Sequence, residues 1–181
     1  MSRINVIQHD SATPEQKDLL NAIDAQLGTI PNFLKVFANS TSALRAFLGL
    51  YSIAGEGSLD TLTRERIAIA VAQQNACQYC VSAHAAIGQK AGLKNTEVDA
   101  NRAGTSEDAR ASVAVKFALA LSEHKGDVTT AELQAVRDAG YSDADIVEII
   151  THVGMNILTN IVGRASRVSI DFPEVKLDIA S

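Results

Sequence analysis

Apolar stretches separated by helix-capping residues fill the middle of the 181-residue chain, whereas both ends alternate apolar and polar residues. A helix is expected after Thr13-Pro14-Glu15-Gln16, which has the form of a capping box with proline at the first helical position. Gly28 would end it. The further helices are predicted at 31–40, 42–55, 64–74, 77–92, 95–104, 107–126, 130–140 and 143–166.

Several capping residues set these boundaries. Ser40 or Thr41, Thr63, Ser106 and Ser142 are expected to open helices, and Thr129 with Glu132 forms a second capping box. The chain is therefore predicted to be all-α, with eight or nine helices and no βαβ unit. The segments 3–10 and 166–179 should be extended arms. A single domain over 1–181 is expected, with a possible N-terminal lobe at 1–57 and a core at 58–181.

Composition supports a helical core and excludes several functions. Hydrophobic residues make up 46% of the chain and aromatic residues only 4%, so the core must consist mainly of Ala, Ile, Leu and Val. The net charge of -5 argues against a nucleic-acid partner. The longest apolar run, 67–72, is far too short for a membrane span, and the N-terminus lacks a signal-peptide core. We expect a cytoplasmic protein with no membrane partner, and no phosphate loop or dinucleotide motif indicates an organic cofactor.

The only two cysteines lie in the stretch NACQYCVSAH, residues 75–84. If a helix begins near Cys77, then Cys77, Cys80 and His84 share one face. A helix N-terminus favours a thiolate, and His84 lies one turn after Cys80, where it could accept the thiol proton. The spacing also permits a disulfide between the two sulfurs. Glu65, early in the preceding apolar helix, is the best candidate to orient His84 across a helix pair.

Less specific interpretations stay open. The cysteines could be two small buried apolar residues, or zinc ligands, although one CxxC and one histidine give only three of four ligands and no second pair exists. No metal is predicted. Glu65 could be a solvated residue in a first helical turn. His152, Asn156 and Asn160 form a polar line in an apolar helix, which is most simply a hydrogen-bonded stripe at a helix or subunit contact.

The segment 61–92 resembles the AhpD-like alkylhydroperoxidases of the carboxymuconolactone decarboxylase superfamily, and the chain is similar to their peroxidase-related branch. The family pattern is a glutamate, eleven residues, and then C-x-x-C-x-x-x-H, which Glu65, Cys77, Cys80 and His84 match. The elements L-T-N and D-F-P near the C-terminus are also similar. The chain departs from the family at Tyr79, where the best-known members carry a further histidine.

This resemblance implies an all-α fold with a core helical hairpin carrying CxxC, and a homo-oligomer, commonly a trimer or hexamer. The implied activity is antioxidant reduction of hydroperoxides by a thiol pair. Cys80 would be the attacking thiolate, His84 the proton acceptor, Glu65 its orienter, and Cys77 the resolving thiol that meets the reductant. The reductant would be a lipoyl-type or thioredoxin-type donor.

Three other functions stay open. The pair could be a redox adapter that passes electrons by disulfide exchange to a separate peroxidase. The superfamily's decarboxylase chemistry is ranked low, because that branch does not use a CxxC pair. A non-catalytic helical binding protein with an incidental disulfide is the remaining alternative.

Overall fold

The computed structural model describes residues 2–178 and contains nine α-helices, one short 3₁₀ helix and no β-strand in that range. The elements are η1 (His9–Ser11), α1 (Pro14–Leu27), α2 (Asn32–Phe37), α3 (Thr41–Ala54), α4 (Thr61–Gln74), α5 (Gln78–Ala91), α6 (Asn95–Arg102), α7 (Ala109–Glu123), α8 (Thr130–Asp138) and α9 (Asp143–Ser166). The predicted all-α fold is confirmed. The C-terminal arm runs without strand pairing as far as residue 178, and residue 179 of the predicted arm lies outside the described residues.

Most of the predicted helix caps are confirmed. Thr13, Thr129 and Ser142 each form a capping box, Ser40 caps α3, and Gly28 ends α1 in the left-handed conformation. Gly92 ends α5 in the same way.

Two predicted caps are wrong. Asp60, not Thr63, caps α4, because its carboxylate accepts hydrogen bonds from the backbone N–H (2.9 Å) and the hydroxyl (2.7 Å) of Thr63. Asp108, not Ser106, caps α7. The Ser106 hydroxyl instead donates a hydrogen bond to the Glu97 carboxylate at 2.5 Å. A tertiary contact with α6 therefore replaces the predicted cap.

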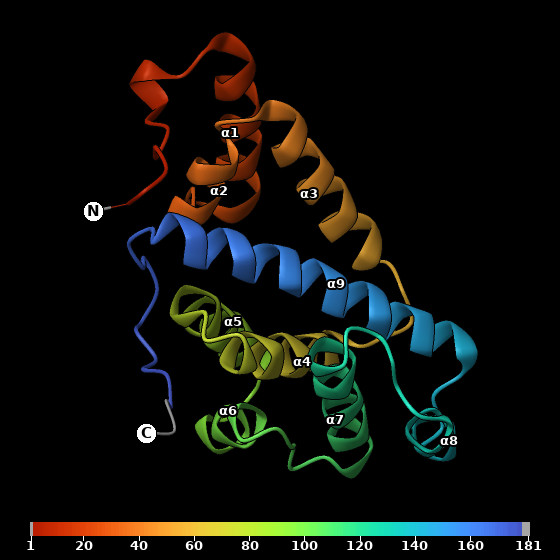
Figure 1. The fold of residues 1–181 in the computed structure, drawn as a ribbon. Coiled ribbons are helices and arrows are strands. Elements are labelled where there is room, and N and C mark those ends of the chain that lie inside the picture. Colours follow the sequence, from red (N-terminus) through yellow and green to blue (C-terminus); the bar gives the residue numbers. More distant parts are fainter. Residues whose placement is uncertain (1, 179–181) are drawn as a thin grey trace.

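Helix α9 runs through the centre of the molecule, with α1–α3 on one side of it and α4–α8 on the other (Figure 1). Helices α4 and α5 form an antiparallel hairpin, and both contact α9. All six residues from Ile67 to Ala72 are buried. Their small and β-branched side chains let α5, α6, α7 and α9 approach α4 from different sides. Helix α4 is therefore packed against four other helices, which fixes the position of the α4–α5 hairpin in the fold.

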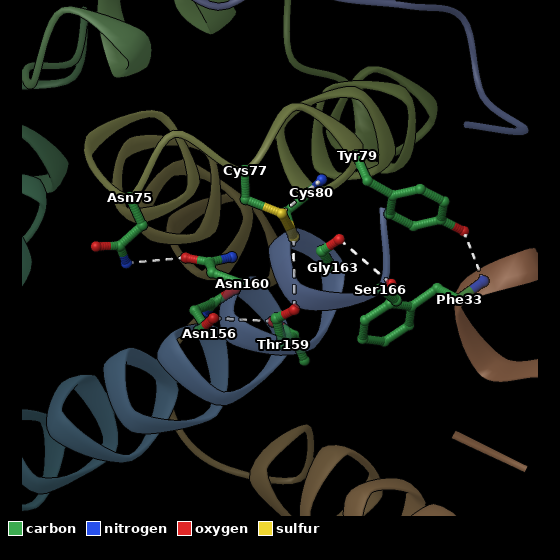
Figure 2. Close-up of a disulfide and its surroundings, with 10 residues drawn as sticks. All are labelled: Phe33, Asn75, Cys77, Tyr79, Cys80, Asn156, Thr159, Asn160, Gly163 and Ser166. Carbon is green, nitrogen blue, oxygen red and sulfur yellow. Dashed lines mark hydrogen bonds between the residues drawn. A yellow bond between two sulfur atoms is a disulfide. The ribbon is translucent and has the colours of Figure 1, made fainter. Parts of the chain in front are cut away.

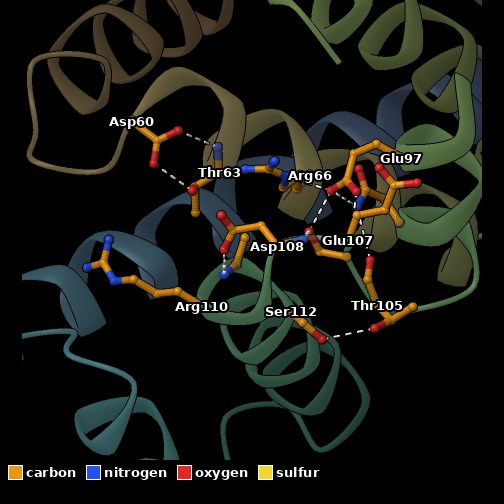
Figure 3. A network of polar contacts seen from close by, with 12 residues as sticks. Asp60, Thr63, Arg66, Glu97, Thr105, Glu107, Asp108, Arg110 and Ser112 are labelled. Atoms are coloured by element: carbon orange, nitrogen blue, oxygen red, sulfur yellow. Dashed lines mark hydrogen bonds and ion pairs between the residues drawn. The ribbon is translucent and has the colours of Figure 1, made fainter. Parts of the chain in front are cut away.

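A buried polar network fixes α4 against α6 and the segment before α7 (Figure 3). The Arg66 guanidinium contacts Glu97 at 2.6 Å, and both side chains are largely buried. Burial alone would raise the pKa of Glu97. The hydrogen bonds from Ser106, Asn101 and the Glu107 N–H, together with Arg66, outweigh burial and lower the pKa below its ordinary value. Glu97 therefore stays ionised and holds the base of the hairpin in register.

Only α9, within the described residues, is long and apolar enough to span a bilayer by length and composition. Half of its most apolar 18-residue stretch is buried inside the molecule, as expected for the core helix of a globular fold. This helix is therefore weak evidence for a membrane location. The cytoplasmic location and the division into lobes at 1–57 and 58–181 stay predictions.

Candidate active site

The turn between α4 and α5 sets Cys77 at the N-terminus of α5, as the sequence predicts. Asn75 ends α4, and Ala76 adopts a left-handed conformation with φ 50°. This reversal makes Cys77 the N-cap of α5, so its sulfur accepts the backbone N–H of Cys80 at 3.4 Å. A donor aimed at this sulfur stabilises negative charge on it.

The two cysteines form a disulfide, with their Cα atoms 5.3 Å apart. Both residues are buried, with 1% of Cys77 and 4% of Cys80 exposed. The sulfurs are bonded to each other rather than arranged around an ion. No group of three or more His, Cys, Asp or Glu side chains suited to a metal occurs between residues 2 and 178.

Glu65 and His84 meet across the α4–α5 hairpin, as predicted. The His84 Nδ1 and Glu65 Oε2 atoms are 2.8 Å apart, and the exposed fractions of the two side chains are 18% and 8%. A carboxylate can only accept this hydrogen bond, so the N–H of Nδ1 is the donor. The other ring nitrogen, Nε2, is then the basic one, free to exchange a proton with a neighbouring group.

Cys80 and His84 line the same apolar cavity, whose volume is about 510 Å³. Its walls come from the N-terminal helices, from α5 and from the C-terminal arm. They include five aromatic side chains, Phe33, Phe47, Tyr51, Tyr79 and Phe172. Cys77 is not part of this wall. The cavity therefore offers an organic molecule an apolar surface with one sulfur and one imidazole.

Helix α9 lies directly against the disulfide through a glycine (Figure 2). A methyl group added at Gly163 would lie 2.9 Å from Cys77 Sγ and 3.3 Å from Cys80 Sγ. The Thr159 carbonyl oxygen is 3.8 Å from Cys80 Sγ and can accept a hydrogen bond from the Cys80 thiol when the pair is reduced. Sequence reasoning missed Gly163. Its only sequence signal is a glycine in a helix interior, which costs about 1 kcal/mol relative to alanine and indicates a packing reason.

The polar line along α9 separates into different environments. Asn156 donates to the His152 carbonyl oxygen within the helix, and His152 lies near the end of α3. Burial lowers the pKa of His152, so this ring is neutral near pH 7. Asn160 alone reaches the disulfide region, where its Oδ1 accepts a hydrogen bond from Asn75 at 2.9 Å.

Tyr79 is a structural connection rather than a proton carrier. Its hydroxyl donates to Asp171 at 2.8 Å and accepts the Phe33 N–H at 3.2 Å, and Phe172 packs edge-on against its ring. Burial and the bond to Asp171 raise the pKa of the Tyr79 phenol far above its usual range. The D-F-P element thus ties the C-terminal arm to α2 and α5 and completes the wall of the apolar cavity.

Comparisons with known proteins match the part of the chain that carries this site to one family. The family model for the carboxymuconolactone decarboxylase family matches residues 42–124, which include the α4–α5 hairpin and all four predicted site residues. A structure described as an uncharacterized peroxidase-related protein from Silicibacter sp. TM1040 is 27% identical, with a TM-score of 0.80 over 93% of this chain and 94% of that one. Residues 42–124 of the chain match the carboxymuconolactone decarboxylase family, and the whole chain shares the fold of this peroxidase-related protein.

Other AhpD-like structures share the fold at lower identity. One described as an alkylhydroperoxidase AhpD core, an uncharacterized peroxidase-related protein from Ralstonia eutropha JMP134, is 23% identical with a TM-score of 0.84, covering 94% of this chain and 92% of that one. The debrominase Bmp8, solved with 2,3,4-tribromopyrrole, is 19% identical with a TM-score of 0.79 over 94% and 92% of the two chains. A search of curated proteins found no match. The match of residues 42–124 to this family and the Cys77–Cys80 disulfide are consistent with a peroxidase-related redox function.

Proposed function

We propose that the protein reduces organic hydroperoxides with its Cys77–Cys80 dithiol. The observation that carries the proposal is the apolar cavity that Cys80 and His84 both line, with Glu65 hydrogen-bonded to His84. An aromatic-lined wall suits a hydroperoxide with a bulky apolar group better than hydrogen peroxide, since burial of apolar surface supplies the binding energy.

In the proposed reaction Cys80 attacks the peroxide, His84 transfers the proton, and Cys77 resolves the oxidised sulfur. His84 Nε2 accepts the Cys80 thiol proton, and the Cys80 thiolate attacks the terminal peroxide oxygen. The O–O bond breaks, the alcohol leaves with the proton from His84, and Cys80 becomes a sulfenic acid. Cys77 then attacks the Cys80 sulfur as a thiolate, and its displaced proton leaves with the hydroxide as water. The overall change is one hydroperoxide and one dithiol to one alcohol, one water and the disulfide.

The test is a single turnover with the reduced protein and cumene hydroperoxide. We expect loss of one equivalent of hydroperoxide per dithiol, with a Cys77–Cys80 disulfide seen by peptide mass. The Cys77→Ser variant should still consume one equivalent and stop at a Cys80 sulfenic acid that dimedone traps. The Cys80→Ser variant should consume none. Full consumption by Cys80→Ser would contradict the mechanism.

Two further outcomes separate the alternatives. Rapid disulfide exchange with negligible hydroperoxide loss would favour the redox adapter. Activity on a lactone acid that survives replacement of both cysteines would favour decarboxylase chemistry. In both the peroxidase and the adapter, the disulfide must be reduced again by an outside thiol, for which a lipoyl-type or thioredoxin-type donor is the expected class.

A second candidate reaction follows from the same cavity. Its five aromatic side chains would also accept a flat aromatic substrate, and the debrominase Bmp8, solved with a brominated pyrrole, has this fold. Bromide release from 2,3,4-tribromopyrrole by the reduced protein, with no loss of cumene hydroperoxide, would favour reductive dehalogenation over the peroxidase.

A further inference from the structure

The two sulfurs of the disulfide open onto different cavities. Cys80 lines the apolar cavity, whereas Cys77 lines a second cavity of about 900 Å³ between the α4–α5 turn and the C-terminal half of α9. The two cavities share a single lining residue, Tyr79. A reagent in the second cavity therefore meets Cys77 and not Cys80.

The second cavity is strongly basic. Arg3, Arg164 and Arg167 line it, and no Asp or Glu from the described part of the chain does so. None of these three side chains is in an ion pair with another residue within 2–178, although four of the other arginines, such as Arg66 and Arg102, are. Three guanidinium groups without an ion-pair partner among the described residues, all lining one cavity, attract an anion.

A buried amide donor faces the same cavity without a partner. Asn160 is 1% exposed, and its Oδ1 is used by Asn75. Its Nδ2 has no hydrogen-bond acceptor in the described structure. Figure 2 shows this nitrogen on the side of the disulfide, away from Asn75. Because a buried amide donor without an acceptor is unfavourable, this amide indicates that a bound molecule or a thiolate supplies the acceptor.

Helix electrostatics alone do not explain this arrangement. Arg164 and Arg167 lie at the C-terminal end of α9, where positive charge is favourable without any ligand. Arg3, however, comes from the N-terminal arm, which a backbone hydrogen bond to Ser166 holds at the same place. Neither Arg3 nor the unpaired Asn160 amide is needed to stabilise the end of a helix.

We propose that this arginine-lined cavity binds the reductant, a small dithiol that carries a carboxylate. The proposal rests on the function proposed above, in that it names the compound that restores the dithiol. Because Cys77 is almost completely buried, only a slender molecule can bring a thiol to it. The arginines hold the carboxylate of that molecule. Gly163 also lines this cavity, and any side chain there would press on Cys77 Sγ.

The exchange balances in two steps. One reductant thiolate attacks Cys77 Sγ, the Cys77–Cys80 bond breaks, and Cys80 leaves with the electron pair and takes a proton from His84. The second reductant thiolate then attacks the reductant sulfur of the mixed disulfide, and Cys77 leaves as a thiolate. The Cys80 N–H and the Asn160 amide supply donors to that thiolate. The products are the protein dithiol and the cyclic disulfide of the reductant.

The test compares two reductants that differ only in charge. Dihydrolipoate and dihydrolipoamide carry the same dithiol, but one ends in a carboxylate and the other in an amide. The rate of disulfide reduction in the oxidised protein is followed by acid quench, alkylation and mass measurement, without any peroxide. We expect dihydrolipoate to react about 5- to 10-fold faster at about 20 mM salt, and this preference to shrink to less than about twofold near 500 mM.

Variants test whether the preference for dihydrolipoate depends on the arginines of this cavity. The Arg164→Gln/Arg167→Gln double variant should lose the preference, so that dihydrolipoate reacts no more than about twofold faster than dihydrolipoamide even at about 20 mM salt. The Arg45→Gln variant removes an arginine from the exposed pair with Glu15, away from the cavity, and should keep the preference. Asn160→Leu should slow both reductants about equally, because it removes a donor to the sulfur rather than to the carboxylate.

Equal rates for the two reductants in the wild-type protein would overturn the proposal, as would a preference that survives in the double arginine variant. Both results concern reduction of the disulfide alone. Failure of the reduced protein to consume hydroperoxide would instead remove the proposed function and leave this result standing.

Discussion

A single hydrogen bond decides which nitrogen of His84 is basic. Because Glu65 occupies Nδ1, the ring presents Nε2 for proton exchange, and the carboxylate stabilises the imidazolium that forms. The pair is shielded from water, so its electrostatic effect is larger than that of a surface pair.

Removal of either residue should slow oxidation of the dithiol. We expect His84→Gln to lower the single-turnover rate with cumene hydroperoxide about 100-fold and Glu65→Gln to lower it about 10-fold, because the first removes the base and the second only its orienting partner. Stopped-flow measurement at several pH values checks this. His9→Gln, which changes an exposed histidine hydrogen-bonded to Asn21, is the control. Unchanged rates in both site variants would exclude a proton-transfer role for the pair.

Tyr79 has a structural role within the C-x-x-C motif. Its hydroxyl joins α5 to α2 and to the C-terminal arm, so Tyr79→Phe should lower the free energy of unfolding by about 1–2 kcal/mol at pH 7. Its pKa is raised in the folded protein, so the unfolded chain releases this proton first. The phenol therefore stabilises the fold below about pH 10, and that contribution is lost as the pH rises further.

Urea unfolding at pH 8 and pH 10.5 measures both effects. The loss of stability between the two pH values should be smaller in Tyr79→Phe than in the wild-type protein. Tyr79→His should not recover the lost stability, since the shorter imidazole does not reach both Asp171 and the Phe33 N–H. An equal loss of stability in Tyr79→Phe and the wild type would mean that the phenol ionises normally.

At the scale of elements, α9 contains two interior glycines with opposite surroundings. A methyl group at Gly154 would meet nothing within 4 Å, whereas one at Gly163 would press on both sulfurs. Gly154→Ala should therefore raise the free energy of unfolding by about 0.5–1 kcal/mol through helix propensity alone. Gly163→Ala should lower it in the oxidised protein, because the disulfide or α9 must shift.

Denaturant unfolding of both variants, with and without reductant, separates these effects. The Gly154→Ala gain should be the same in either redox state. The Gly163→Ala loss should be smaller after reduction, when the two sulfurs can turn away from the added methyl group. A gain in stability from Gly163→Ala in the oxidised protein would show that the contact has no energetic weight.

The elements themselves could largely be predicted from sequence, because most of their ends are set by local chemistry. Thr13, Thr129 and Ser142 cap the helices that follow them through side chains only three residues from their partners. Ser106 failed as a predicted cap for the opposite reason. Its hydroxyl is used by Glu97, nine residues earlier and on another helix, and no local pattern reveals that contact.

The candidate site likewise contains residues that are close in the sequence, which could be predicted, and residues that are distant in the sequence, which could not. Cys77, Cys80 and His84 lie within eight residues, and Glu65 is one helix away, so helical spacing was enough to bring them together. Gly163, Thr159 and Asn160 come from about 80 residues further along the chain. Their approach to the disulfide depends on the packing of α9 against the hairpin, which the sequence does not encode locally.

At the scale of the whole molecule, α9 leaves an apolar strip uncovered. Val147, Ile150 and Leu158 are 42–61% exposed and lie on one face at helical spacing. Exposed apolar strips of this kind are typical of subunit contacts, and a homo-oligomer is the expectation from the family resemblance.

A charge in this strip should disrupt such an assembly. We expect Val147→Glu/Ile150→Glu to reduce the mass measured by light scattering from a trimer or hexamer toward that of one 19.2 kDa chain. Lys116→Glu, at an exposed position of α7, should leave the mass unchanged. A wild-type protein that is monomeric at micromolar concentration would contradict the expectation.

The arginine-lined cavity at Cys77 and the apolar cavity at Cys80 are separate, and this separation has a kinetic consequence. Many shuttle enzymes receive and deliver electrons through one opening, so an excess of one co-substrate fills the space that the other needs and forms a dead-end complex. Here the proposed hydroperoxide and the proposed reductant can be bound at the same time, one in each cavity, on either side of the Cys77–Cys80 disulfide. Steady-state turnover should therefore keep rising to a plateau with the concentration of either co-substrate, without the downturn that a shared opening would impose.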